Sequence, residues 1–170
     1  CAEMWAAFHL GDASLHERLR VRSSDEFKLA TASVPRLMAW EIGSVGAILK
    51  GSIAEGLRFF HELVDEARKD ELPLIEVRGT AFLVTFSLFA ADEIHEVEVQ
   101  VNRALAVAFE NRLEPGYHTM LLNGALAEIR LRQGRFEESR QALSLVIKDA
   151  QSIQWPPVEI ATTLARIMYV

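Results

Sequence analysis

The hydrophobic positions of this chain recur at intervals of three and four residues from end to end. That interval matches the roughly 3.6 residues of a helical turn and predicts amphipathic helices, each with one apolar face. No segment alternates between apolar and polar residues, which is the pattern of a half-buried strand. We therefore predict an all-α protein with helices at about 2–10, 13–31, 35–50, 53–70, 73–90, 93–112, 116–133, 136–153 and 157–170.

Two interleaved series of boundary residues divide these helices into pairs. Proline suits the first turn of a helix, where its missing N–H is not needed, and glycine suits the turn that ends a helix. Prolines at alternate helix starts lie about forty residues apart, at Pro35, Pro73, Pro115 and Pro156. The turns inside the pairs recur at the same interval, at Gly11, Gly51, Asp92 and Gly134. Asp92 is also a suitable N-cap for the helix that follows it.

One helix–turn–helix unit of about forty residues is therefore copied along the chain, which is typical of a helical solenoid. We predict a right-handed α–α superhelix of about four such repeats, forming a single domain over residues 1–170. Solenoid ends need polar capping faces, and both ends of this sequence are apolar. This favours a segment excised from a longer protein, and the alternative is a self-contained domain that dimerises through its apolar ends.

The turn sequences resemble the turn between the two helices of a tetratricopeptide repeat. In that family the turn reads glycine, polar, aromatic or aliphatic, any residue, acidic, small. Segments 134–139 and 51–56 match this pattern closely, segment 92–97 departs at its first and last places, and segment 11–16 keeps only its beginning. The period near forty exceeds the family's usual length of about 34 residues. Longer, weaker repeats of this kind are similar to those of bacterial signal-transduction ATPases, of large LuxR-like transcriptional regulators of the maltose-activator type, and of proteins with nucleotide-cyclase domains.

The resemblance implies a packing role for each turn position. Glycine closes the turn, the apolar residue two places later fills the gap between the helices, and the small residue lets the helices approach. Trp40 and Ser44 stand where the family uses a large residue and a small residue four places later. Leu126 and Ala127 take the equivalent packing role in a later copy.

In such arrays the first helix of each pair, the A helix, lines a concave groove. Counting back from the turns predicts these groove residues: Trp5, Phe8, Met38, Glu41, Val45, Ile48, Phe82, Phe86, Phe89, Leu121, Glu128 and Arg132. The three phenylalanines fall at intervals of four and three, so they form one stripe for a partner helix or an aromatic effector. Packing against neighbouring helices is the alternative. Glu128 and Arg132 are four residues apart and are expected to pair on the surface, or to anchor a charged ligand.

Composition narrows the possible partners. The 170 residues are 50% hydrophobic, with a net charge of −6. This acidic balance disfavours direct binding to nucleic acid or to an anionic membrane surface. The basic cluster Arg18, Arg20 and Arg22 is followed by acidic residues and is expected to be a solvated face. A single cysteine, Cys1, fits a reducing compartment, and no apolar run approaches the ~20 residues needed to span a bilayer, so we expect a cytoplasmic location.

Patterns typical of catalysis or of cofactor binding are weak. His61 with Asp65, and Asp92 with His95, could each place two metal ligands on one helical face, but no third ligand follows at a suitable spacing. There is no phosphate-binding glycine loop, no nucleophile elbow and no pair of Glu-x-x-His motifs. The tryptophans Trp5, Trp40 and Trp155 each stand alone at their level, which favours packing. We therefore expect no enzyme activity, no metal and no cofactor.

These observations favour a non-catalytic binding module within a larger bacterial regulator, for which a transcriptional regulator is the expected kind. It would bind a protein, a peptide or a small effector in its groove and pass a change of curvature to neighbouring domains of the same chain. One alternative is a structural oligomerisation module that stacks through its uncapped ends. Another is the repeat region of a nucleotide cyclase or kinase, and an unfamiliar α-helical enzyme is the third.

Overall fold

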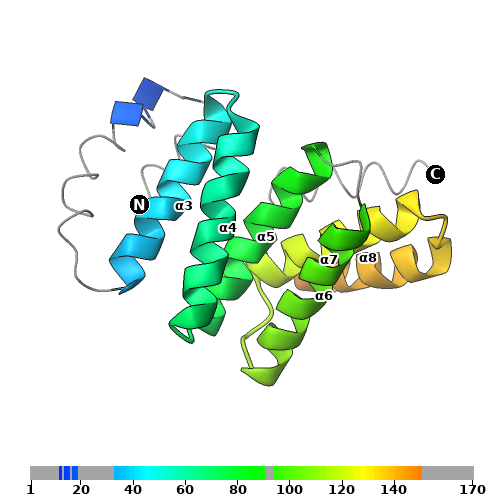
Figure 1. Cartoon of the computed structure of the whole chain (residues 1–170). Coiled ribbons are helices and arrows are strands. Elements are labelled where there is room, and N and C mark those ends of the chain that lie inside the picture. Colours follow the sequence, from blue (N-terminus) through cyan, green and yellow to red (C-terminus); the bar gives the residue numbers. More distant parts are fainter. Residues whose placement is uncertain (1–11, 13, 16, 19–32, 91–93, 151–170) are drawn as a thin grey trace. The chain divides into compact units, whose positions relative to one another are not determined.

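The regular structure of the described residues is entirely α-helical (Figure 1). The structure is a computed structural model that describes residues 12, 14–15, 17–18, 33–90 and 94–150. Residues 14–15 and 17–18 are helical. The longer helices are α3 (Ser33–Leu49), α4 (Ile53–Lys69), α5 (Pro73–Ala90), α6 (Ile94–Glu110), α7 (Tyr117–Arg132) and α8 (Phe136–Ala150).

The prediction of an all-α chain is confirmed for the part that the structure describes. Each predicted helix from 35–50 to 136–153 begins and ends within three residues of an observed helix. The predicted helices 2–10 and 157–170, most of 13–31 and the turn at Asp92 lie outside the described residues. The right-handed superhelical arrangement stays a prediction.

The chain forms two compact units, residues Cys1–Gly79 and Thr80–Val170. In the first unit α3 packs against α4, and in the second α7 packs against both α6 and α8. Helix α5 runs across the boundary between the units. Because each repeat of a solenoid contacts only its neighbours, such an array can divide into units without a linker. The single domain predicted from the sequence therefore stays a prediction.

Four helix ends share one turn geometry. In each turn the second residue after the helix has a positive φ: 83° at Gly51, 53° at Glu71, 52° at Arg112 and 73° at Gly134. The N–H of the next residue then donates to the carbonyl five places earlier, at N···O distances of 2.8–3.0 Å. This is the Schellman arrangement, which satisfies carbonyls left open at a helix end. The predicted role of glycine at positions 51 and 134 is confirmed, whereas Glu71 and Arg112 adopt the same strained conformation without being glycine.

Small residues bring the paired helices together, as the turn sequences predict. Gly56 of α4 is buried, and a Cβ there would lie 2.8 Å from the backbone oxygen of Ser44 on α3. In the second unit Ser139 of α8 is buried, and its hydroxyl donates to the backbone oxygen of Ala127 on α7 at 2.8 Å. Leu126 is buried beside it. The expected role of small residues at the pair interface is confirmed in both pairs.

The predicted role of the apolar residue two places after the turn glycine is wrong. Ile53 and Phe136 occupy this position, and they are 40% and 53% exposed instead of filling the gap between the helices. The gap needs no plug, because the Schellman hydrogen bond closes the turn and the buried Gly56 and Ser139 bring the helices into contact.

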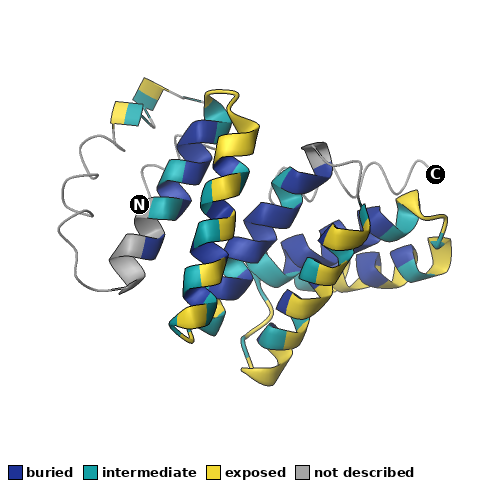
Figure 2. Ribbon diagram, in the orientation of Figure 1, coloured by how far each residue is buried: buried dark blue, intermediate teal, exposed yellow. Residues whose placement is uncertain are grey.

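Burial separates the helices into two kinds (Figure 2). The A helices α5 and α7 are shielded around most of their circumference, and every residue of α7 from Met120 to Ile129 is buried. The B helices α4, α6 and α8 bury one face and expose the other. Since a helix apolar on all sides belongs in an interior, the A helices form the core of their units.

Candidate interaction site

The predicted aromatic stripe lies on α5, within the second unit. Phe82 is 4% exposed, and its ring centroid lies 6.0 Å from that of Tyr117 and 5.8 Å from that of His118. Tyr117 and His118 also meet edge to face, at 5.2 Å. These are favourable aromatic geometries, so Phe82 packs between α5 and α7 as the alternative interpretation expected. Phe86 is partly buried, and the side chain of Phe89 lies outside the described residues.

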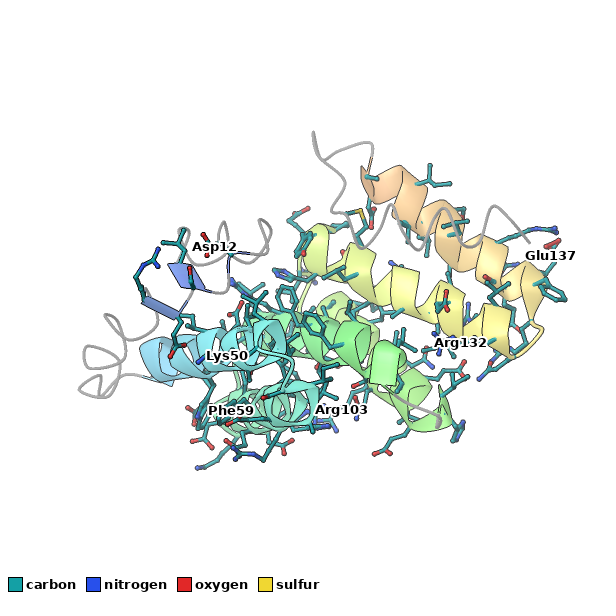
Figure 3. The ribbon with its side chains drawn as sticks, turned by 90° about the horizontal axis from the view of Figure 1, so that it is seen from above. Asp12, Lys50, Phe59, Arg103, Arg132 and Glu137 are labelled. Atoms are coloured by element: carbon teal, nitrogen blue, oxygen red, sulfur yellow. The ribbon has the colours of Figure 1, made fainter. Side chains whose placement is uncertain are left out.

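Glu128 and Arg132 pair, but the pair does not lie on the surface as expected. Arg132 Nε donates to Glu128 Oε1 at 2.9 Å, and the Glu128 side chain is only 6% exposed. Arg132 Nη2 also donates to the backbone oxygen of Leu88, near the end of α5, at 3.2 Å (Figure 3). Arg132 therefore ties the end of α7 to the last turn of α5. The sequence could not predict this, because residues 88 and 132 are brought together only by tertiary packing.

Two more buried carboxylates on A helices are held by arginines. Arg78 of α5 donates to Glu41 Oε1 of α3 from Nη2 at 2.6 Å and from Nε at 3.0 Å. Arg68 Nε of α4 donates to Glu76 Oε1 of α5 at 2.7 Å. A buried carboxylate is costly unless it is paired, so these contacts stabilise the packing of α5 in the first unit. Glu41, a predicted groove residue, is thus a structural ion-pair partner.

The remaining predicted groove residues are mostly internal. Val45 and Leu121 are 2% and 4% exposed, and Ile48 is partly buried. The side chains of Trp5, Phe8 and Met38 lie outside the described residues. Among the residues that are described, the stripe and its neighbours thus offer little open surface beyond Phe86, Tyr117 and His118. The last two were not predicted, because they follow a proline in the first turn of a helix and match no repeat position.

A charged cluster joins α6 to the turn between α7 and α8. Glu98 of α6 accepts hydrogen bonds from Gln133 Nε2 and Arg135 Nη1, each at 2.8 Å. Arg135 also pairs with Glu138 at 2.5 Å. The hydrogen bond from Gln133, followed by the bond from Arg135, lowers the pKa of Glu98, and the bond from Arg135 lowers the pKa of Glu138. The cluster is therefore ionised at neutral pH and clamps α6 to the next hairpin.

The first unit contains a second contact between a carboxylate and a turn, at equivalent sequence positions. Glu17 Oε2 pairs with Lys50 Nζ at 2.9 Å. Glu17 lies six residues after the turn position Gly11, just as Glu98 lies six after Asp92. Lys50 precedes the turn glycine Gly51, as Gln133 precedes Gly134. In each unit a carboxylate therefore binds the turn of a hairpin that follows it in the chain, α3–α4 in the first unit and α7–α8 in the second, at equivalent sequence positions. We call these two contacts the turn clamps.

The metal ligands suggested by the sequence do not form a site among the described residues. No group of three or more His, Cys, Asp and Glu residues there could hold a metal ion, and His61 and His95 are exposed. No helix among the described residues is both long and apolar enough to cross a membrane. Comparison with protein-family models, with curated proteins and with solved structures gives no match for this chain. Its function is therefore argued from its own contacts.

Proposed function

We propose that this chain is a non-catalytic binding module, a tetratricopeptide-like array that holds a peptide or a small effector. The observation that carries the proposal is the pair of turn clamps, Glu17–Lys50 and Glu98–Gln133/Arg135. Equivalent contacts between consecutive hairpins are what a stacked repeat array requires. Stacked hairpins offer an extended surface for recognition, and such arrays commonly use that surface to bind peptides.

The charged groups favour binding over catalysis. Glu41, Glu76 and Glu128 are buried, and each is neutralised by an arginine. A general acid or base needs a group that can reach a substrate and exchange a proton near neutral pH. Carboxylates held in buried ion pairs are poor candidates for that role. We assign them to the packing of the array.

The surface proposed for the ligand combines the partly exposed rings of Tyr117 and His118, which pack on the buried Phe82, with Phe86, one helical turn after Phe82 on α5. These side chains come from α5 and α7, both of which are A helices. Aromatic rings bury large area at little entropic cost, and the hydroxyl of Tyr117 and the imidazole of His118 can form hydrogen bonds. The cluster suits a peptide with an apolar or aromatic side chain next to a polar group. Buried Phe82 and Glu128 support this surface and are not expected to touch a ligand.

In the proposed mechanism, occupation of the cluster changes the curvature of the array and so acts on neighbouring domains of the same chain. The resemblance to long-period repeats supports the proposal that the module belongs to a larger cytoplasmic bacterial regulator, for which DNA binding would belong to another domain. A nucleotide cyclase or a kinase would be the alternative neighbour. In either case we propose that the chain itself holds no cofactor.

The proposal is tested by selecting peptides from a random phage-displayed library against the whole chain. We expect selected peptides to bind Phe86→Ala at least tenfold more weakly, a loss of about 1.4 kcal/mol. The control is Phe109→Ala on α6, because Phe109 is also aromatic, is 85% exposed and lies on a helix that does not supply the proposed surface. Peptides that bind both variants and the parent chain equally would refute the assignment of this surface.

A second candidate function is a structural oligomerisation module. The observation in its favour is that two apolar side chains on one side of α8, Phe136 and Ile147, are exposed. Peptide selection and self-association are independent measurements, so the two functions can be separated experimentally.

A further inference from the structure

Helix α5 is attached to α7 near Phe82 and again near Leu88, both within the second unit. At the first place the ring of Phe82 packs on two rings in the first turn of α7. At the second, the backbone oxygen of Leu88 accepts a hydrogen bond from Arg132 Nη2 at 3.2 Å. Phe86 lies between these points on α5, four residues after Phe82 and two before Leu88. The place of Phe86 relative to α7 is therefore set from both sides.

The guanidinium of Arg132 is itself oriented by Glu128, one turn earlier on α7. Arg132 Nε donates to Glu128 Oε1 at 2.9 Å, and the Glu128 side chain is only 6% exposed. Because a guanidinium is planar and rigid, a bond at Nε also fixes the direction in which Nη2 points. The contact with Leu88 thus depends on two nitrogens at a fixed spacing, which the single nitrogen of a lysine does not reproduce.

The turn clamp holds α7 at the same end. Gln133 continues the helix, with a φ of −82° and its N–H bonded to the backbone oxygen of Ile129 at 3.0 Å. The side chains of Gln133 and Arg135 bind the two carboxylate oxygens of Glu98 on α6, each at 2.8 Å. Contacts to α5 and to α6 together resist rotation of α7 about its axis and sliding along it. A rigid helix passes both displacements from one end to the other.

The start of α7 is held less closely by the chain itself. Six residues, 111–116, connect α6 to α7, whereas three, 133–135, connect α7 to α8. Tyr117 and His118 follow this longer connection directly, in the first turn of α7. Their position relative to α5 therefore depends on the contacts made at the far end of the helix.

We infer that Arg132 is a positioning residue for the proposed ligand surface: it fixes the separation between Phe86 on α5 and the rings of Tyr117 and His118 on α7. The inference rests on the proposed function for the identity of that surface. Arg132 acts through the two helices, because its Nε and Nη2 are directed to Glu128 and to the backbone of α5. This role differs from the anchoring of a charged ligand, which the sequence alone allowed.

The test uses peptides that were selected against the whole chain and that bind Phe86→Ala more weakly. Arg132→Gln should weaken their binding about fivefold, as if the competent arrangement fell to about one fifth of the population. Arg132→Lys should weaken it as much, because it keeps the charge but loses the planar pair of donors. The matched control is Arg140→Gln on α8, where Arg140 pairs only with Glu137 of the same helix among the described residues. This control should bind as the parent does.

A double-mutant cycle separates positioning from a general loss of stability. If Arg132 acts through the placement of Phe86, Arg132→Gln should have no further effect on affinity in the Phe86→Ala chain. A lower folded fraction would instead weaken binding by the same factor in both chains. Circular dichroism checks that every variant keeps its helix content.

A measurement without ligand tests the positioning by itself. The ring of His118 lies 5.8 Å from that of Phe82, so the NMR shifts of its ring protons report how α7 sits against α5. Arg132→Gln should move these shifts, and Arg140→Gln should not.

The inference is overturned by any one of three results. These are unchanged His118 shifts in Arg132→Gln, parent-like affinity in Arg132→Gln or Arg132→Lys, and a full effect of Arg132→Gln in the Phe86→Ala chain. If instead every selected peptide binds Phe86→Ala as tightly as the parent chain, the proposed ligand surface is wrong. The His118 shifts then still decide whether Arg132 sets the position of α7.

Discussion

The contact between α3 and α4 gives the sharpest test of the packing described above. In Gly56→Ala the new methyl group would lie 2.5 Å from Ile48 Cγ1 and 2.8 Å from the backbone oxygen of Ser44. The Ile48 side chain can rotate, but a backbone oxygen in the middle of α3 cannot, so the two helices must separate. Overpacking of this kind costs about 3 kcal/mol, the upper part of the usual range. Alanine recovers about 1 kcal/mol of helix propensity, leaving a net loss of about 2 kcal/mol.

Gly43→Ala is the matched control for this substitution. Gly43 lies within α3, and a Cβ there would meet only Phe59 Cδ2 at 3.9 Å, an ordinary contact. The same chemical change should therefore stabilise the chain by about 0.5–1 kcal/mol through helix propensity alone.

Urea unfolding followed by circular dichroism measures both variants. With a slope of about 2 kcal/mol per molar urea, Gly56→Ala should lower the midpoint by about 1 M. Gly43→Ala should raise the midpoint by a few tenths. If Gly56→Ala is as stable as the parent chain, the close approach of α3 and α4 is wrong.

Four further substitutions each test one local feature of the structure. Glu71→Gly should raise the free energy of unfolding by about 1 kcal/mol, since glycine adopts the positive φ of 53° without strain; unchanged stability in urea would refute this. Arg78→Met should lower it by about 3 kcal/mol by removing the guanidinium bound to buried Glu41, and Glu41→Gln combined with Arg78→Met should recover part of that loss in the same assay. Thr80→Val should stabilise by about 1 kcal/mol in thermal unfolding, because the buried Thr80 hydroxyl has no hydrogen-bond partner among the described residues; destabilisation would imply that it has one. The pKa of Glu98 in the folded chain lies below its ordinary 4.5, so the stabilisation that ionised Glu98 gives is present above pH 4.5 and is lost as the pH falls through the folded pKa. The free energy of unfolding of Glu98→Gln should therefore depend less on pH below 4.5 than that of the parent chain.

The turn clamps connect the turn of a hairpin to a helix that precedes it in the chain. The clamp position is acidic at Glu17 and Glu98, apolar at Leu57 and basic at Arg140. The chemistry of the position therefore varies between repeats, although two of them make the same contact. If the clamps set the spacing of consecutive hairpins, substitution of Glu98 should affect packing near the α7–α8 turn before it affects the helices themselves.

Local physical chemistry made the helices predictable. The turn glycines Gly51 and Gly134 adopt positive φ as their position implies, and the small residues Gly56 and Ser139 lie at the helix contacts. These features depend on residues close together in the chain, so a repeating pattern is enough to find them. Glu71 and Arg112 show the limit of the method. They adopt the turn conformation of glycine, but their identity does not mark them.

The candidate site was harder to predict because burial depends on contacts between distant segments. The periodicity placed Phe82 and Glu128 on one face of their helices but could not show whether that face is open. Tyr117 and His118 cover Phe82, and Arg132 reaches Leu88 from a position 44 residues away.

The sequence by itself thus determined the helical class, the approximate helix boundaries and the glycine turns at Gly51 and Gly134, since each is set by interactions within a few residues. Tertiary structure alone decided which carboxylates are buried, which arginines neutralise them and which aromatic rings retain some surface. Those outcomes depend on how the hairpins pack, and hydrophobic packing is not directional enough for one sequence pattern to specify its partner.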